Sequence, residues 1–186
     1  ELQQSLTALK ITVPTDIQEK VIPVLLNQKE DVVALAKTGT GKTGAFGLPL
    51  LQLINVEDTN IQAVILAPTR ELGQQIYNNL VSFAAHSPKI SIASICGGIP
   101  IKPQIERLKA NTHIIVATPG RLADLVKREA INIKNISFLI LDEADHMLDL
   151  GFIKDIRYVK RMLTRKHQTL FFSATINKEI KKDQKN

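Results

Sequence analysis

The chain has 186 residues, of which 44% are hydrophobic and 23% are charged. These values fit one globular domain with a buried core and exclude a disordered or low-complexity chain. The formal net charge of +6 favours an anionic partner, such as nucleic acid or an acidic membrane surface, although a merely soluble basic protein fits it equally well.

Cysteine content and hydropathy indicate the compartment. Cys96 is the one cysteine, so it has no disulfide partner within the chain. No apolar run approaches the roughly 18 residues that span a bilayer, and the first residues lack the basic and apolar parts of a signal peptide. We therefore expect a cytoplasmic protein that is not held in a membrane.

Six short apolar runs predict β-strands. Val64, Ile65 and Leu66 stand together in one of them, and the run from Phe138 to Leu141 is apolar throughout. Runs without alternating polar residues are typical of strands that are covered on both faces, as in a parallel sheet. The predicted strands are residues 31–36, 63–67, 90–95, 113–118, 138–141 and 169–172.

Helical periodicity separates these runs. In one segment Ile17, Val21 and Leu25 recur on a single stripe. The alternation of strands and helices predicts an α/β domain with a mostly parallel sheet and helices on both faces, whose ligands bind beyond the carboxyl ends of the strands. The predicted helices are residues 15–26, 71–83, 120–128 and 152–163.

The domain is expected to fill residues 1–175. Residues 176–186 are polar and rich in lysine. We interpret them as the start of a helix or linker, or as a frayed end.

A glycine-rich loop follows the first predicted strand. Residues 36–43 read Ala-Lys-Thr-Gly-Thr-Gly-Lys-Thr, and an apolar stretch from Phe46 to Leu53 comes after them. Backbone N–H groups of such a loop point at phosphate oxygens, and the following helix adds its positive dipole end. Lys42 can reach the β- and γ-phosphates, and the Thr43 hydroxyl can bind Mg²⁺. The sequence therefore predicts a nucleotide site.

Two carboxylates follow the predicted strand at residues 138–141. Asp142 can hold Mg²⁺, and Glu143 can orient or deprotonate an attacking water, as a P-loop ATPase requires. The pair could instead cap a helix that begins near Ala144. The upstream phosphate loop favours the catalytic interpretation, with Lys42, Asp142 and Glu143 as the catalytic residues.

The triplet Ser173-Ala174-Thr175 stands at the end of the last predicted strand. The two hydroxyl groups could hydrogen-bond to Asp145 or respond to the γ-phosphate. Helix capping explains such a triplet equally well.

Together these motifs resemble the DEAD-box family of ATP-dependent RNA helicases. Asp142-Glu143-Ala144-Asp145 spells the family's name, and residues 36–43 are similar to its first motif. The resemblance covers essentially the whole chain and implies the N-terminal RecA-like domain, which has a P-loop NTPase fold. Further segments resemble the Q motif at residues 14–18, motif Ia at 68–72, the GG motif at 97–98, motif Ib at 118–121 and motif III at 173–175.

For the nucleotide site, the resemblance implies ATP and Mg²⁺ as ligands. Gln18, and less directly Thr15, would recognise adenine. Thr43 and Asp142 would hold Mg²⁺. The residues that would cradle the phosphates are Thr38, Gly39, Thr40, Gly41, Lys42 and Thr43. The residues that would couple nucleotide to RNA are Asp145, Ser173 and Thr175.

For RNA, the resemblance implies a surface that binds the sugar-phosphate backbone. An arginine suits bidentate phosphate binding. From the residues alone another interpretation stays open, because Arg70 and Arg121 could simply begin helices after strands that end in proline. The implied RNA-binding residues are Thr69, Arg70, Gly98, Thr118 and Arg121.

The resemblance implies a second RecA-like domain as a partner, and no such domain follows Thr175 in this chain. Because that domain carries arginine fingers, which accelerate related phosphoryl transfers by about 10³–10⁵-fold, we expect this chain alone to hydrolyse ATP very slowly. The full-length protein would couple ATP hydrolysis to local RNA duplex unwinding or ribonucleoprotein remodelling. Two rivals stay open: an ATP-gated RNA clamp without productive unwinding, and a P-loop motor that acts on DNA or protein.

Overall fold

One sheet organises the chain. The computed structural model describes residues 2–27 and 30–175, and the predicted tail at residues 176–186 lies outside them. The strand order is β1-β6-β5-β2-β4-β3, and every pairing between the described strands is parallel, which confirms the predicted fold class. The strands are β1 Val32–Leu35, β2 Ala63–Leu66, β3 Ile92–Ile95, β4 Ile114–Ala117, β5 Phe138–Leu141 and β6 Gln168–Ser173.

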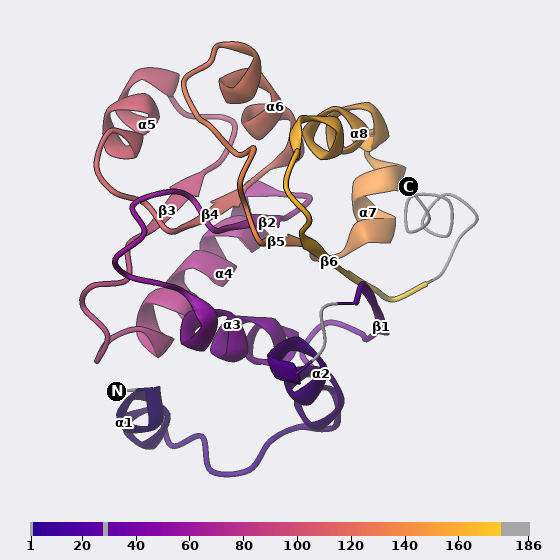
Figure 1. Cartoon of the computed structure of the whole chain (residues 1–186). Coiled ribbons are helices and arrows are strands. Elements are labelled where there is room, and N and C mark those ends of the chain that lie inside the picture. Colours follow the sequence, from indigo (N-terminus) through magenta and orange to yellow (C-terminus); the bar gives the residue numbers. More distant parts are fainter. Residues whose placement is uncertain (1, 28–29, 176–186) are drawn as a thin grey trace.

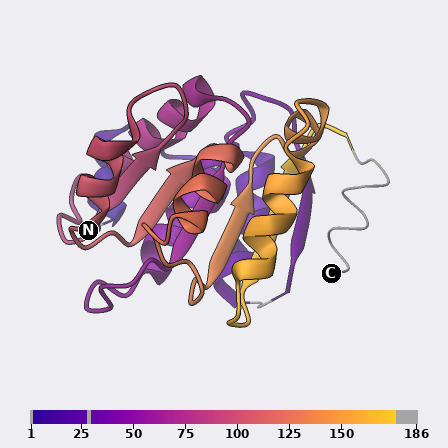
Figure 2. The same ribbon diagram turned by 90° about the horizontal axis from the view of Figure 1, so that it is seen from above.

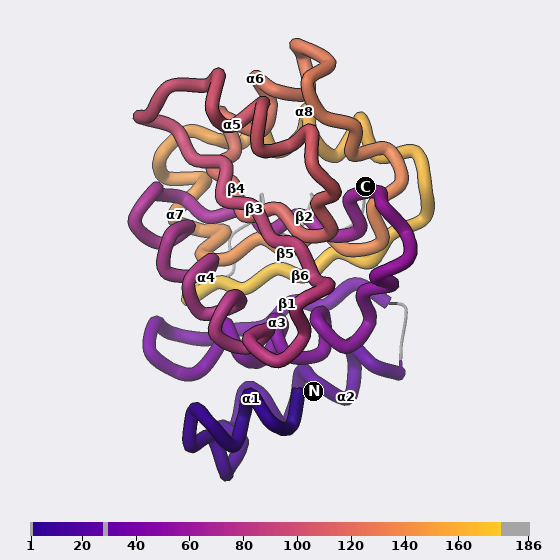
Figure 3. Tube along the Cα trace, turned by 90° about the vertical axis from the view of Figure 1, so that its left-hand side faces the viewer, coloured from indigo at the N-terminus to yellow at the C-terminus, as the bar shows by residue number. Residues whose placement is uncertain are grey.

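Helices cover both faces of this sheet, as Figures 1 and 3 show. Side chains of α1 to α4 pack with one half of the core, and side chains of α5 to α8 pack with the other half. The helices of the described residues are α1 Leu2–Ala8, α2 Asp16–Asn27, α3 Lys42–Leu53, α4 Arg70–Phe83, α5 Ile101–Leu108, α6 Pro119–Lys127, α7 Ala144–Asp149 and α8 Ile153–Met162.

The apolar strands fill both halves of the core. In β2, Ala63 and Ile65 join the half under α2, α3 and α4, whereas Val64 and Leu66 join the half under α6 and α8. Successive side chains of a strand point to opposite faces, so a strand between two helical layers must be apolar at every position. All four of these residues are fully buried.

Two helices, α1 and α5, were absent from the sequence-based expectation. In α5, Pro100 occupies the N-cap position and Pro103 lies in the first turn. Proline is tolerated there because the first N–H groups of a helix have no partner inside it, yet two prolines in a short window read as a loop signal.

Among the described residues, no helix is both long and apolar enough to cross a membrane.

Candidate functional site

A cavity of about 440 Å³ opens at the carboxyl edge of the sheet. It lies between the loop after β1, the residues after β5, and one face of α4. Of the predicted nucleotide and catalytic residues, the cavity brings together Gln18, Thr38, Gly39, Gly41, Lys42, Thr43, Asp142 and Glu143. Thr15 and Thr40 instead line a second hollow, and Gly39 lines both.

The loop between β1 and α3 has the backbone that phosphate binding requires. Gly39 has a φ of +82° and Gly41 a φ of +85°, a region that favours glycine. Gly41 is the N-cap of α3 and offers no side-chain cap, so the first N–H groups of the helix remain available to an anion. The Thr40 hydroxyl donates to the carbonyl of Lys37 at 2.8 Å, which closes the turn.

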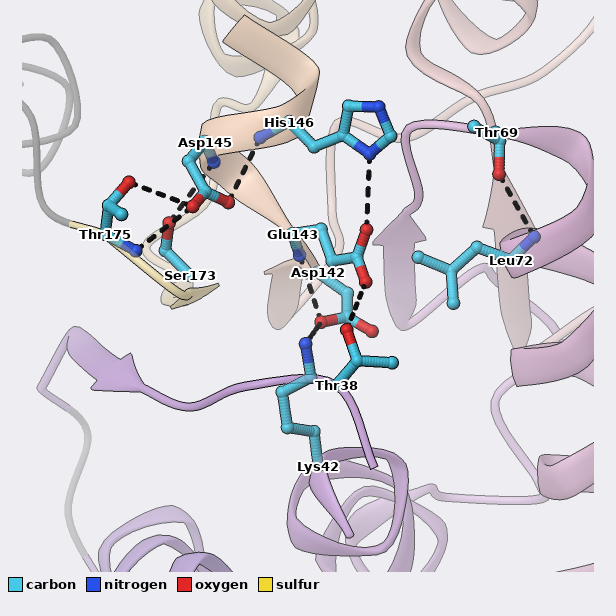
Figure 4. A network of polar contacts seen from close by, with 10 residues as sticks. All are labelled: Thr38, Lys42, Thr69, Leu72, Asp142, Glu143, Asp145, His146, Ser173 and Thr175. Atoms are coloured by element: carbon cyan, nitrogen blue, oxygen red, sulfur yellow. Dashed lines mark hydrogen bonds and ion pairs between the residues drawn. The ribbon is translucent and has the colours of Figure 1, made fainter. Parts of the chain in front are cut away.

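An ion pair joins the loop to β5. Lys42 Nζ lies 3.1 Å from Asp142 Oδ1, and the two side chains are 8% and 2% exposed (Figure 4). Burial raises the pKa of Asp142, and the charge of Lys42 and its hydrogen bond oppose that rise. The Glu143 N–H also donates to Asp142 Oδ1, at 3.0 Å. A buried carboxylate is thus held beside the lysine that would meet the phosphates.

Glu143 lies at the entry to α7 in a left-handed conformation, with φ 52° and ψ 52°. A left-handed backbone conformation is uncommon for residues other than glycine, and the residues that adopt it cluster at functional sites. Although Glu143 occupies the N-cap position, its side chain caps no N–H group. It therefore does not act as the helix cap that the alternative interpretation of the acidic pair expects. Its Oε1 instead accepts the Thr38 hydroxyl at 3.2 Å, and its Oε2 lies 3.3 Å from Nδ1 of His146 (Figure 4).

Gln18 connects α2 to the phosphate loop. Its Oε1 accepts the N–H of Thr15 at 3.0 Å, and its Nε2 donates to the carbonyl of Gly41 at 3.1 Å. A Cβ on Gly41 or Gly44 would come within 2.8 Å or 2.6 Å of that Nε2, so both glycines allow the amide to approach. Beside the predicted contact with adenine, Gln18 therefore has a second role that the sequence did not indicate.

Asp145 bridges to the end of β6. Its Oδ2 accepts the hydroxyl of Thr175 at 2.9 Å and the N–H of Thr175 at 3.0 Å. The Asp145 N–H donates to Ser173 Oγ at 3.3 Å (Figure 4). Burial acts to raise the pKa of Asp145, but hydrogen bonds from Thr175, Ser173 and the His146 N–H outweigh it and hold the pKa below its usual value. The three predicted coupling residues thus form one network.

The predicted RNA-binding residues gather where β2, β3 and β4 end. Thr69 is the N-cap of α4, and its Oγ1 accepts the Leu72 N–H at 3.2 Å (Figure 4). Arg70 is exposed at the first position of that helix, and a Cβ on Gly98 would lie 3.8 Å from its Nη1. Gly98 has a φ of +80°. The exposed guanidinium thus lies over the glycine turn after β3.

Thr118 and Arg121, which follow β4 in the chain, hold the same turn in place. The nearly buried Thr118 hydroxyl accepts the Gly97 N–H at 3.1 Å. Arg121 donates through Nη2 to the Ile99 carbonyl at 2.9 Å and through Nη1 to Gln104 Oε1 at 2.8 Å. All five predicted residues therefore lie at one edge, although two of the side chains also hold the loop itself.

Gln104 is a further residue of this region, and no sequence motif singled it out. It is 4% exposed, and its Nε2 donates to the carbonyl of Cys96 at 2.9 Å, so its amide ties α5 to the turn and to Arg121. The only local signal is a polar residue on the otherwise apolar side of a short helix. That signal is too weak to separate a buried amide from an exposed one without the fold.

The chain matches a known family over most of its length. A family model described as DEAD/DEAH box helicase matches residues 15–182. A probable ATP-dependent RNA helicase of Methanocaldococcus jannaschii is 47% identical over 167 residues, which are 90% of this chain and 45% of that protein. The DEAD-box ATP-dependent RNA helicase CshA of Bacillus subtilis is 43% identical over 182 residues, which are 98% of this chain and 36% of that protein.

Solved structures agree with the sequence matches. A DEAD box protein from Methanococcus jannaschii superposes with a TM-score of 0.92 at 42% identity, covering 100% of this chain and 50% of that one. An ATP-dependent RNA helicase described as hypothetical, from Sulfolobus tokodaii, gives 0.89 at 37% identity, with coverage of 99% and 53%. The chain thus spans half or less of the curated relatives it matches. By its sequence and its fold, this chain belongs to the DEAD-box helicases and forms the N-terminal RecA-like domain of that family.

Proposed function

We propose that this chain binds ATP with Mg²⁺ at the carboxyl edge of β1 and β5, and RNA at the carboxyl edge of β2, β3 and β4. The whole protein would then couple ATP hydrolysis to local unwinding of RNA duplexes or remodelling of ribonucleoproteins, with a second RecA-like domain as its partner. The observation that carries this proposal is the buried pair of Lys42 and Asp142 beside Glu143, whose carboxylate is not used to cap α7.

The chemistry of the phosphate end follows from these side chains. Lys42 places a cation at the first turn of α3, where phosphate oxygens also meet free N–H groups. Glu143 carries a carboxylate within the same cavity and is the general base that would take a proton from water. Thr38, which donates to that carboxylate, fixes the orientation of the carboxylate before any ligand binds.

Asp142 and Thr43 fit the needs of Mg²⁺. This ion keeps several waters and takes one or two protein carboxylates together with substrate phosphates, so it needs no cluster of three acidic ligands. Asp142 is a nearly buried carboxylate that requires a cation beside it, and Thr43 adds a hydroxyl group in the same cavity. Bound Mg²⁺ would supply charge neutralisation at the phosphates.

The RNA assignment rests on the second group of residues. Arg70 presents an exposed guanidinium above the glycine turn at Gly98, and Arg121 presents part of another one. Exposed arginines beside backbone that lacks side chains suit a sugar-phosphate chain that approaches closely. The network from Asp145 to Ser173 and Thr175 links the first turn of α7, close to the catalytic pair, to the end of β6, the strand beside β5. We propose that this network couples nucleotide to RNA.

The test uses the longer natural protein with both RecA-like domains. ATP hydrolysis is measured with no nucleic acid, with single-stranded RNA and with DNA of the same sequence, and strand displacement is measured on a short RNA duplex. Stimulation by RNA together with displacement supports the proposal. Stimulation by DNA alone, or none by either, points to a motor that acts on DNA or protein. RNA stimulation without displacement points to an RNA clamp.

We also propose that the protein acts in the cytoplasm. RNA is the proposed substrate, and the single Cys96 thiol is buried and unpaired, which suits a reducing compartment. Fractionation of cells, with the protein followed by antibody, tests this location.

A further inference from the structure

A separate cavity, of about 580 Å³, lies at the edge of the sheet opposite to the nucleotide site and to the hollow beside it. It is lined by the end of α8, by the turn that follows it and by residues at the starts of β1 and β6. Figure 2 shows this turn at the edge where the strands begin, away from their arrowheads. Since β6 has six residues at roughly 3.3 Å each, about 20 Å separate the two edges. The cavity is therefore distinct from the site described above.

The walls of this cavity are strongly basic. Residues 153–167 contain six lysines and arginines and one acidic residue, and they carry a formal +5 of the chain's +6. All the other residues together are thus nearly neutral. The excess charge of the protein is concentrated on one helix and one turn. The lysine and arginine side chains that line the cavity are Arg157, Lys160, Arg161, Arg165 and Lys166, and the imidazole of His167 lies beside them.

Acidic residues are scarce in the lining of this cavity. Asp31 is the one acidic residue in the lining, and its Oδ1 accepts the N–H of Thr169 at 2.7 Å. Asp58 lies near the rim, where hydrogen bonds from Asn60 chiefly lower its pKa and the charge of Arg165 adds to that effect. Arg161, Arg165 and Lys166 are all exposed.

The turn that carries two of these cations is held in place. The N–H groups of Thr164 and Arg165 both donate to the carbonyl of Lys134 at 3.2 Å. Nδ1 of His167 donates to the carbonyl of Arg165 at 3.0 Å. A fixed backbone means that a ligand does not have to order the turn when it binds.

We propose that Arg161, Arg165 and Lys166 form a second RNA-binding surface, the rear basic surface, which holds the phosphate backbone of RNA that extends beyond the strand bound at the carboxyl edge. This inference rests on the proposed RNA function. A polyanion fits the surface better than a membrane or an apolar protein face does, because none of the large exposed hydrophobic residues of the described chain lies between residues 153 and 167.

The experiment compares single-stranded RNAs of about 8 and about 30 nucleotides, labelled with a fluorophore, on the 186-residue chain. The variant is Arg161→Gln, Arg165→Gln and Lys166→Gln together. The control removes the same charge at Lys89, Lys109 and Arg128, which are 76%, 65% and 57% exposed and lie on other elements. Thermal unfolding checks that both variants fold.

The expected result is selective for length. The variant should lose about tenfold or more of its affinity for the long RNA at low salt, and its slope of log affinity against log salt should fall by about 2, because each lost single-strand phosphate contact removes about 0.7. Affinity for the short RNA, and both affinities of the control, should stay within about twofold of the wild type. Slopes that match between variant and control would overturn the inference.

Two further outcomes keep the proposals separate. If the wild type binds neither RNA, the proposed RNA function fails together with this inference. If the wild type binds the short RNA and the variant binds the long RNA equally well, only the rear basic surface fails. In a parallel arm with vesicles of phosphatidylserine and phosphatidylcholine, loss of vesicle binding by the variant without loss of long-RNA binding would assign the surface to anionic lipid and overturn the inference.

Discussion

Lys42 Nζ and Asp142 Oδ1 lie 3.1 Å apart, across the gap between the first turn of α3 and the end of β5. The two residues are 100 positions apart in the sequence, and both side chains are almost fully buried. Each charge is stabilised by the other, because water reaches neither of them well. The pairing therefore limits the cost of burying the two charges in the free domain, and it keeps both groups at the proposed nucleotide site.

Replacing Lys42 should show both effects. Lys42→Ala leaves the Asp142 carboxylate buried without its cation, and we expect a loss of about 3–5 kcal/mol in the free energy of unfolding at neutral pH, together with weaker ATP binding. Calorimetry of unfolding and titration with a fluorescent ATP analogue measure the two quantities. Unchanged ATP affinity would contradict the phosphate contact.

The pH dependence of that loss has a definite sign. Burial raises the pKa of Asp142 above 3.8, and removing Lys42 raises it further. A raised folded-state pKa means that stability falls as the pH rises through it, since the buried group must then ionise. The penalty of Lys42→Ala should thus shrink as the pH falls through the raised pKa of Asp142, above 3.8, where the carboxylate takes up a proton. The double variant with Asp142→Asn should show little penalty at any pH.

Glu143→Gln tests the general base in the longer protein. Glutamine can still accept the Thr38 hydroxyl, but it cannot take a proton from water. We expect ATP binding within about twofold of the wild type, and turnover lower by about 10²–10⁴-fold. Glu106→Gln, on the exposed face of α5, is the matched control and should leave turnover unchanged. Turnover near the wild-type rate would remove Glu143 from the role of base.

Gly44 should be intolerant of even one methyl group. Its Cβ would lie 2.6 Å from Gln18 Nε2, so Gly44→Ala must displace the amide from Gly41, at a loss of about 0.5–1.5 kcal/mol. In a Gln18→Ala background the same change should be neutral or stabilising, because alanine is the better helix former by about 1 kcal/mol. Chemical denaturation of the four proteins gives the coupling. Additive effects would mean that the approach of Gln18 to Gly44 is unimportant.

Gly120→Ala provides the comparison for that experiment. Gly120 is also helical, but a Cβ there would meet its neighbours at an ordinary 3.8 Å. We expect its substitution to be neutral or to stabilise the domain by up to about 1 kcal/mol, by the same amount in both backgrounds.

Asp145 should stabilise the link to β6 in a pH-dependent way. Its lowered pKa means that its stabilising effect is present above 3.8 and is lost as the pH falls through the folded-state value. Asp145→Asn should therefore cost about 1 kcal/mol at neutral pH, and this difference should narrow as the pH falls below 3.8. Denaturant unfolding at several pH values measures it. Asp149→Asn, on the exposed side of α7, is the control and should leave stability at neutral pH unchanged.

Arg121 should contribute to RNA binding through its charge and its planar shape. Arg121→Ala should weaken binding of short RNA and reduce the salt slope by about 0.7, whereas ATP binding without RNA should be unchanged. Arg121→Lys keeps the charge but loses the paired donors to Ile99 and Gln104, so an intermediate affinity is expected. An RNA titration of Arg121→Ala that overlays the wild type would restrict Arg121 to holding the loop.

Much of the fold could be predicted because its strands are buried on both faces. The run from Phe138 to Leu141 has no polar position, and the structure places it inside the sheet as β5. The phosphate loop was equally clear, since glycines at positions 39 and 41 serve left-handed backbone that few other residues adopt. Local chemistry was sufficient at these positions.

Other features depend on residues far apart in the chain. No local pattern indicated that Gln18 would bind the Gly41 carbonyl, that Gln104 would be buried beside Arg121, or that Thr38 would meet Glu143. Each contact joins segments that approach only when strands of distant sequence pair within one sheet. Polar side chains carry no local record of which distant group they will meet.

The sequence by itself determined the family of the chain, the parallel α/β fold and the types of residue at the nucleotide and RNA sites, because these follow from local spacing and from burial of apolar runs. Only the tertiary structure decided which partners those residues have. It placed Lys42 against Asp142 and kept the Glu143 carboxylate from capping α7. It also gathered the basic residues of α8 and its turn at the opposite edge. The physical reason is that strand order is set by packing of the whole core, and strand order decides which loop ends become neighbours.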